Sequence, residues 1–263
     1  MSSSGATTMS SSTRVFPPLY TSSGDDSADR LAFFHILERL KTQKRTGWID
    51  HGVRLSLCSQ LENKLNFCDR LASQRGRAPV PLNTAIPMLI FRLDPFSSIS
   101  DHMYRMAVLA MCTSDEKLDI PKCVMMCVVH DLAEAQVGDI TPRERISRAE
   151  KQRLEEEAMH NFVHEMLHNS PAAQRIEALW KEYEDGKTPE ARFVKDLDRF
   201  ELASQAFEYE RTYTARNLQT FFDTSLPKVR HTEVREWGED LMKERKELWK
   251  AIEPEQPTFN SLL

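Results

Sequence analysis

The sequence has no apolar run close to the roughly 18 residues that a membrane-spanning helix requires, and no membrane partner is expected. Its first residues, MSSSGATTMSSSTRVFPP, lack the apolar segment of a secretory signal. Organelle targeting stays open as an alternative, because one arginine and no acidic residue precede Asp25. Basic residues are not in excess either: 35 Lys and Arg stand against 40 Asp and Glu, a formal net charge of −5. Nucleic acid is therefore not an expected partner, whereas a small phosphorylated substrate needs only a local positive site.

The cysteines do not form a disulfide pattern. They number five and their spacing does not repeat, which favours a reducing compartment such as the cytoplasm. Cys123 and Cys127 stand four residues apart in an apolar run, and we interpret them as core residues of a helix rather than metal ligands.

Helical patterns dominate the chain, and neither a convincing strand nor an internal repeat is found, so we predict an all-α fold. Residues 1–26, rich in Ser and Thr, are predicted to be a disordered tail. The domain is predicted over residues 27–250, followed by a C-terminal tail at 251–263. Within it, residues 54–97 have weak periodicity and several prolines, and they are interpreted as an insertion of uncertain order.

Helix boundaries can be predicted from capping residues. Ser27 or Asp29 is expected to begin a first helix, and residues 98–112 form the next clear pattern. Pro121 suits the first turn of an apolar helix that we expect to be buried all round and to end near Gly138. The remaining predicted features are an apolar face on the first helix (Leu31, Phe34, Leu37, Leu40) and four later helix starts (Ser147 with Glu150, Ser170-Pro171, Thr188-Pro189, Thr232).

The pair His130-Asp131 is the most informative feature of the sequence. It ends the most apolar helix of the chain, where a carboxylate needs a cation or several hydrogen-bond donors. His102 lies in a second apolar helix, and Asp198 interrupts the apolar stripe of a third. Asp196 is the competitor of Asp198, but its neighbours Arg192 and Arg199 indicate a solvated surface instead.

Two imidazoles and two carboxylates form a mixed nitrogen and oxygen ligand set, which suits Mn, Fe, Co, Zn or Mg. Such an ion lowers the pKa of a water and neutralises phosphate charge. Glu134 shares the helix face of His130 and Asp131, and Asp139 follows at the next turn. Either acid can relay a proton or orient the water.

The segments SISDHMYRMAVLAM, VVHDLAEAQVGDITP and FVKDLDRFELASQAFEYE follow one another in the order H…HD…D. This arrangement resembles the HD-domain phosphohydrolases, most closely their 5′-deoxynucleotidase branch of the HD domain-containing protein 2 type. The similarity includes RTGW at 45–48 and covers about residues 27–53 and 95–250. It implies an all-α fold, a homodimer, hydrolysis of deoxyribonucleoside 5′-monophosphates, and a requirement for Mn, Co or Mg, with Zn as a further candidate.

The resemblance also implies roles for particular residues. His102, His130, Asp131 and Asp198 match the metal ligands of the family. Glu134 and Asp139 match active-site acids that also touch a second ion, and the carbonyl oxygen of Ile140 is a further candidate ligand. Arg45 and Trp48 fall in a stretch that approaches the phosphate and the sugar or base.

The insertion is the departure from the family pattern. In similar proteins the RTGW stretch leads within about ten residues to the segment before SDH, whereas more than forty residues intervene here. A lineage-specific loop and retained non-coding sequence both stay open as its origin. If the insertion cannot loop out, Arg45 and Trp48 would be displaced.

Several other patterns have simpler interpretations. His160, His164 and His168 recur at helical spacing, but the acids around them indicate a solvated or partner-facing surface. Arg105 either neutralises phosphate or forms a surface ion pair. The alternative functions are another phosphohydrolase activity, on diesters or nucleoside triphosphates, and a non-catalytic metal-binding module.

Overall fold

The computed structural model describes residues 14–50, 97–141, 144–213 and 217–252. The predicted insertion at 54–97, apart from its last residue, lies outside these ranges, as do residues 1–13 and 253–263 of the two predicted tails. The described elements are α1 (Asp26–Ile36), α2 (Glu38–Thr42), α3 (Thr46–Asp50), α6 (Ile99–Ala110), α7 (Ile120–Val129), α8 (Glu134–Val137), α9 (Arg148–Asn161), the π-helix η2 (Phe162–Met166), α10 (Pro171–Asp185), α11 (Pro189–Tyr213), α12 (Gln219–Ser225), the 3-10 helix η3 (Leu226–Lys228) and α13 (Thr232–Ile252).

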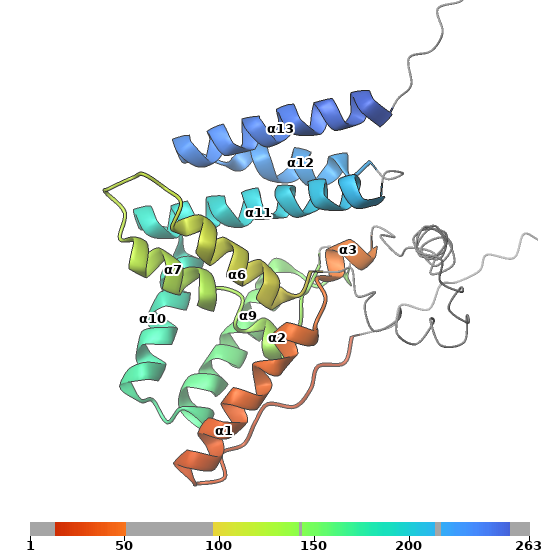
Figure 1. The fold of residues 1–263 in the computed structure, drawn as a ribbon. Helices are drawn as coiled ribbons and strands as arrows, with labels where there is room; N and C mark the ends of the chain where they lie inside the picture. The colour runs from red at the N-terminus through yellow and green to blue at the C-terminus, as the bar shows by residue number, and fades with distance from the viewer. Residues whose placement is uncertain (1–13, 51–96, 142–143, 214–216, 253–263) are drawn as a thin grey trace, which may run out of the picture.

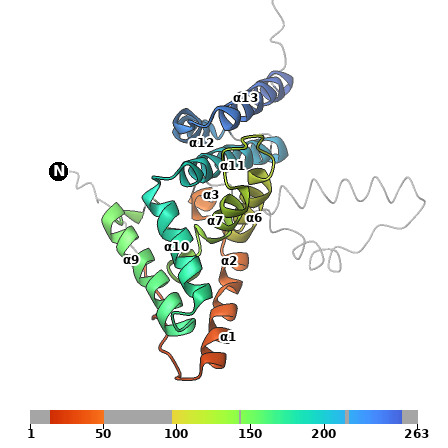
Figure 2. The ribbon, with the colours of Figure 1, turned by 90° about the vertical axis from the view of Figure 1, so that its left-hand side faces the viewer.

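The fold is all-α, as predicted, and α11 is its centre. Helices α6 and α7 pack against each other and against one side of α11, while α12 and α13 contact its other side. Figure 2 shows α11, α12 and α13 stacked at one end of the molecule, with α1, α9 and α10 extending from the opposite end. No described helix is long and apolar enough to cross a membrane.

Most of the predicted helix starts are confirmed by their capping bonds. The side chains of Ser147 and Ser170 accept the backbone N–H groups of residues 150 and 173. Pro121 lies in the first turn of α7, and the Thr188 hydroxyl accepts the N–H of Ala191 at the start of α11. These bonds satisfy N–H groups that a helix leaves without intrahelical partners.

The first helix differs from its prediction in both its cap and its face. Asp25, not Ser27 or Asp29, caps α1. The buried side chains are Phe33, Ile36 and Leu40, whereas Leu31 and Phe34 of the predicted face are 50% and 53% exposed. The predicted face repeated every third residue, which drifts about 60° around the helix at each step and therefore cannot stay on one side.

The segment before α1 is packed against the domain rather than separate from it. Tyr20 exchanges two hydrogen bonds with the side chain of Asn161 in α9. Asp29 is fully buried and accepts hydrogen bonds from Tyr20, Ser22 and Ser23. The tail predicted for residues 1–26 is therefore wrong for residues 14–25, because buried Asp29 requires these donors.

The apolar helix α7 is not buried all round, since Met125 and Val128 are 43% and 49% exposed. It also ends earlier than predicted, at Val129, and a turn and the short helix α8 lead to Gly138. Cys123 and Cys127 are buried in the core, as predicted.

The two ends of the insertion meet beside the domain. Lys44 and Ser98 form an isolated antiparallel bridge. The Arg45 N–H donates to the Ser97 carbonyl over 3.4 Å, and the Ile99 N–H donates to the Gln43 carbonyl over 3.3 Å. The segments on either side of α3 and the insertion therefore lie side by side, and residues 43–45 keep their place in the domain.

Candidate metal centre

Three helices bring the four predicted metal ligands together. His102 is the fourth residue of α6, whose start is fixed by a reciprocal capping box between Ser98 and Asp101. His130 is the C-cap of α7, and Asp131 follows it in the turn. Asp198 lies in the first half of α11.

The side-chain ends of these residues converge. The Nε2 atom of His102 lies 3.3 Å from Oδ1 of Asp198 and 3.7 Å from Oδ2 of Asp131. The Nε2 atom of His130 lies 3.2 Å from the same Asp131 oxygen. One ligand atom each from His102, His130 and Asp198 lie within 4.8 Å of one another.

The hydrogen bonds of the two imidazoles fit a divalent ion. His130 Nδ1 lies 2.9 Å from the Cys127 carbonyl oxygen, and His102 Nδ1 lies 2.5 Å from Oε2 of Glu201. Because both oxygens can only accept, each Nδ1 carries a proton and donates it. Each Nε2 is buried and has no hydrogen-bond partner among the described residues. Imidazoles held in this way present a lone pair at Nε2, which is how histidines bind metals.

The carboxylates are ionised and the histidine beside them is basic. Burial and the charge of Arg45 oppose the imidazolium form of His102, but Glu201 and Asp198 outweigh them and raise the pKa of His102 to about 9. Burial also opposes ionisation of Asp131 and Asp198. The neighbouring histidines reverse this effect and hold the pKa of both carboxyls below the ordinary value. Two ionised carboxylates therefore stand beside the imidazole nitrogens, as a cation site requires.

Glu201 is a residue beside the centre that the sequence did not reveal. Its side chain is buried, and it accepts hydrogen bonds from His102 and from Nε of Arg105, the latter over 2.9 Å. Its position three residues after Asp198, on the same face of α11, was the available signal. Arg105 is therefore held in an ion pair with a buried carboxylate, and any contact of Arg105 with phosphate stays a prediction.

Asp196 does not lie in the centre. It is buried rather than solvated, and its carboxylate accepts hydrogen bonds from the Arg199 side chain and from the backbone N–H groups of Arg230 and His231. The reason given for preferring Asp198, a solvated Asp196, is therefore wrong. The geometry nevertheless places Asp198, and not Asp196, beside His102.

Arg45 lies in the field of the metal centre despite the insertion. The charges of Asp131, Asp198, Glu201 and Asp139 outweigh burial and raise the pKa of Arg45. Its Nη1 atom is buried without a hydrogen-bond partner among the described residues. A buried guanidinium N–H group without an acceptor suits a phosphate oxygen.

The loop with Asp139 fixes the position of Arg45. The Asp139 carboxylate accepts the Thr46 N–H over 2.6 Å, and the Asp139 carbonyl accepts the Thr46 hydroxyl over 3.0 Å. Arg14 donates to the same carbonyl over 3.0 Å. Asp139 thus binds the start of α3, and its predicted contact with a second ion, like that of the Ile140 carbonyl, stays a prediction.

Trp48 supports this segment from the core. It is 1% exposed, its ring stacks on Phe221 at 4.3 Å between centroids, and its edge meets Tyr209 at 5.1 Å. The ring is covered by protein, so the structure assigns Trp48 an anchoring position, and contact with a sugar or base stays a prediction.

Glu134 is the acid suited to proton transfer. It is 6% exposed at the start of α8. Burial, together with the charges of Asp131 and Asp139, raises the pKa of Glu134 well above its ordinary value. Glu134 therefore favours its protonated form beside the ionised Asp131 carboxylate, as a general acid requires.

The three histidines at helical spacing do not form a metal stripe. The His160 and His164 rings are in contact, but the α-helix ends at Asn161, and His168 instead pairs with Asp29 at 2.9 Å. In the described ranges, the only group of three or more candidate ligands is the one formed by His102, His130 and Asp198.

Comparison with known proteins gives the family of the chain. The sequence pattern of the HD domain matches residues 88–237, more than half of the chain, and the chain therefore belongs to the HD domain family. It is 35% identical over 222 residues to the 5′-deoxynucleotidase hdd1 of Schizosaccharomyces pombe, covering 84% of this chain and 92% of that protein. It is 34% identical to the human 5′-deoxynucleotidase HDDC2, covering 86% and 90% of the two chains.

Solved structures show the same fold. HD domain-containing protein YGK1 aligns with a TM-score of 0.50 and 30% identity, covering 66% of this chain and 91% of that chain. The PH0347 protein from Pyrococcus horikoshii aligns with a TM-score of 0.53 and 22% identity, covering 83% and 99%. The similarity to PH0347 concerns the fold alone.

Proposed function

We propose that the chain is a metal-dependent 5′-deoxynucleotidase, which hydrolyses deoxyribonucleoside 5′-monophosphates to the deoxyribonucleoside and phosphate. The observation that carries the proposal is the pair of buried Nε2 atoms, on His102 and His130, that face carboxylate oxygens and have no hydrogen-bond partner among the described residues. Arg45 adds a buried guanidinium N–H group for the phosphate. The names of the relatives with 34% and 35% identity support the same activity.

One set of residues would hold a metal ion, and Arg45 would bind the phosphate. His102, His130, Asp131 and Asp198 would hold a divalent ion, which supplies charge neutralisation and a water of lowered pKa. Arg45 neutralises one phosphate oxygen and orients the phosphoryl group. Its anchor through Thr46 to Asp139 limits the movement of this arginine during the reaction.

Glu134 supplies the proton for the leaving group. Water adds to phosphorus as the bond to the 5′ oxygen breaks, and the nucleoside leaves with a proton on that oxygen. Protonated Glu134 donates this proton, and the carboxylate then recovers one from the attacking water. The raised pKa of Glu134 favours the acid form that this step requires.

The test is a phosphate-release assay on purified full-length chain. Deoxyribonucleoside and ribonucleoside monophosphates, a cyclic nucleotide, a phosphodiester and nucleoside triphosphates are each supplied with Mn, Co, Mg or Zn. We expect release from deoxyribonucleoside monophosphates, with Mn or Co giving the highest rates, and loss of most activity in Asp198→Ala. Hydrolysis only of the diester or triphosphates would replace the proposal with another phosphohydrolase activity. Full metal occupancy with no hydrolysis would identify a non-catalytic module.

We also propose a homodimer in the cytoplasm. Two packed helices expose apolar stripes: Tyr104 and Val108 on α6 with Met111 at its C-cap, and Met125 and Val128 on α7. Exposed apolar surface of this kind is common at protein interfaces. Light scattering should give the mass of two chains, and Met111→Glu with Val128→Glu should halve it. A monomeric wild type would refute the dimer.

The free Cys112, Cys123 and Cys127 fit a reducing compartment such as the cytoplasm. A fluorescent fusion would test this location.

A further inference from the structure

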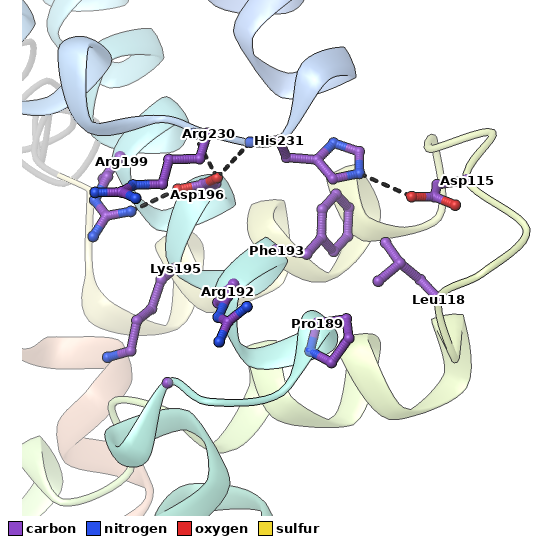
Figure 3. A pocket seen from close by; sticks show the side chains of 11 residues that line it. Asp115, Leu118, Pro189, Arg192, Phe193, Lys195, Asp196, Arg199, Arg230 and His231 are labelled. Carbon is purple, nitrogen blue, oxygen red and sulfur yellow. Dashed lines mark hydrogen bonds and ion pairs between the residues drawn. The ribbon is translucent and has the colours of Figure 1, made fainter.

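A second pocket lies apart from the metal centre, between the start of α11 and the start of α13. Its volume is about 460 Å³, within the range of small-molecule sites. Figure 3 shows its side chains, which come from the loop before α7, from α11 and from the turn before α13. The lining residues are Asp115, Leu118, Gly186, Pro189, Arg192, Phe193, Lys195, Asp196, Arg199, Arg230 and His231.

Positive charge dominates this pocket. Four basic side chains line it against two carboxylates, in a chain whose formal net charge is −5. Within the described part of the chain, no carboxylate forms an ion pair with Arg192, Lys195 or Arg230. Cations gathered in a concave site repel one another, so an anion bound there would relieve this repulsion.

Both carboxylates of the pocket are already occupied. Asp196 accepts one hydrogen bond from Arg199 and two from the backbone N–H groups of Arg230 and His231, each of the latter over 2.8 Å. Asp115 pairs with Nε2 of His231 at 3.3 Å. The acids therefore fix the wall of the pocket, and Figure 3 shows Arg199 and Arg230 side by side next to Asp196.

The pocket is distinct from the metal centre but connected to it. None of the proposed metal ligands lines it. The ammonium group of Lys195 lies 4.1 Å from the centroid of the Tyr183 ring. Tyr183 in turn donates its hydroxyl hydrogen bond to Asp198 over 3.3 Å, and its ring contacts His130. An anion that draws Lys195 toward itself would change the charge next to two metal ligands.

We propose that this pocket binds a small phosphorylated anion with at least two negative charges, separately from the substrate. Three arginines favour phosphoryl oxygens, because the planar guanidinium group donates paired hydrogen bonds to them. The volume admits a diphosphate with an organic group, which would contact Phe193, Leu118 and Pro189 on the apolar side of the pocket.

The test measures binding of inorganic pyrophosphate and of a nucleoside diphosphate to the full chain by isothermal titration calorimetry. We expect both to bind, and Arg192→Gln with Arg230→Gln to weaken binding at least tenfold. The matched control is Lys243→Gln with Lys250→Gln, which removes the same charge from exposed sites of α13 and should retain wild-type affinity. Circular dichroism confirms that each variant is folded.

Three results would overturn the proposal. The first is no binding of either anion by the wild type at millimolar concentration. The second is an equal loss of affinity in the pocket variant and in the control, because overall charge would then explain binding. The third is loss of binding in Asp198→Asn, which would locate the anion at the metal centre. Tighter binding of the nucleoside diphosphate than of pyrophosphate supports the pocket and identifies a nucleotide; equal binding supports it and identifies the diphosphate group.

Discussion

Replacing Glu201 by glutamine tests whether a single buried carboxylate sets the metal-binding form of His102. Glu201 accepts from His102 Nδ1 at 2.5 Å with one oxygen and from Arg105 Nε at 2.9 Å with the other. Glutamine has one acceptor oxygen and one donor NH2 group in place of these two oxygens. It can therefore serve His102 or Arg105 as an acceptor, but not both.

The competition between the two partners decides the outcome. Arg105 is charged and directs both Nε and Nη2 at the same oxygen, so the glutamine oxygen should stay with Arg105. The NH2 group then faces His102 and turns Nδ1 into an acceptor, which moves the imidazole proton to Nε2. A protonated Nε2 cannot bind a metal. Loss of such a partner typically costs 10- to 100-fold in metal affinity, and we expect the upper end, about 2.7 kcal/mol.

The measurement is metal affinity by competition with a chromophoric chelator. The control is the double variant Glu201→Gln with Arg105→Leu. It frees the glutamine oxygen to accept from His102 and should recover at least part of the lost affinity, as a double-mutant cycle would reveal. Wild-type affinity in Glu201→Gln would refute the reasoning, and equal affinity in the single and double variants would refute the role of Arg105.

Three further predictions follow from the same geometry. Because the pKa of His102 is about 9, a metal must displace the imidazole proton in order to bind. Metal affinity should therefore rise about tenfold per pH unit from pH 7 toward 9. Competition with a chelator across this range measures the affinity, and a flat profile would contradict the prediction. Burial, opposed by Lys151, raises the pKa of Glu155 from 4.5 to about 7. Between these two pKa values the folded state holds a proton that the unfolded chain has released. The free energy of unfolding should therefore fall as pH rises from 4.5 to about 7. Glu155→Gln should remove that part of the fall in thermal unfolding of the metal-free protein, whereas the exposed Glu156→Gln should not, and parallel profiles for all three proteins would count against the assignment. Asp196→Asn should lower the free energy of unfolding by about 1–3 kcal/mol in denaturant, because Asp196 accepts three hydrogen bonds in a buried position. The same variant should leave metal affinity unchanged. A loss of metal with unchanged stability would reverse the assignment of Asp196 and Asp198.

The sequence predicted those features that depend on local chemistry. Ser147, Ser170 and Pro121 act within one turn of their own helices, so their positions were readable without a structure. His102 and His130 were predicted to share a metal because both stand in apolar helices, where a polar group needs a partner, and because the H…HD…D order resembles the HD-domain phosphohydrolases.

The features that the sequence did not predict depend on packing between distant segments. Asp196 was expected at the surface, because the backbone N–H groups that donate to its carboxylate belong to Arg230 and His231, which are distant in sequence. Trp48 was expected near substrate, but α11 and α12 cover its ring. Asp29 was expected to cap a helix, although the side chains of residues 20–23 bury it instead.

The bridge between Lys44 and Ser98 has a consequence for how the chain tolerates change. Loop-closure entropy grows only with the logarithm of loop length, so extending a ten-residue connection to about fifty residues costs only ~1.4 kcal/mol. The hydrogen bonds at 43–45 and 97–99 hold the two ends of this connection together. Residues 54–96, which follow Thr46 and Trp48 in this connection, are therefore a permissive site, at which shortening, replacement or insertion of a foreign domain should leave the helical domain folded.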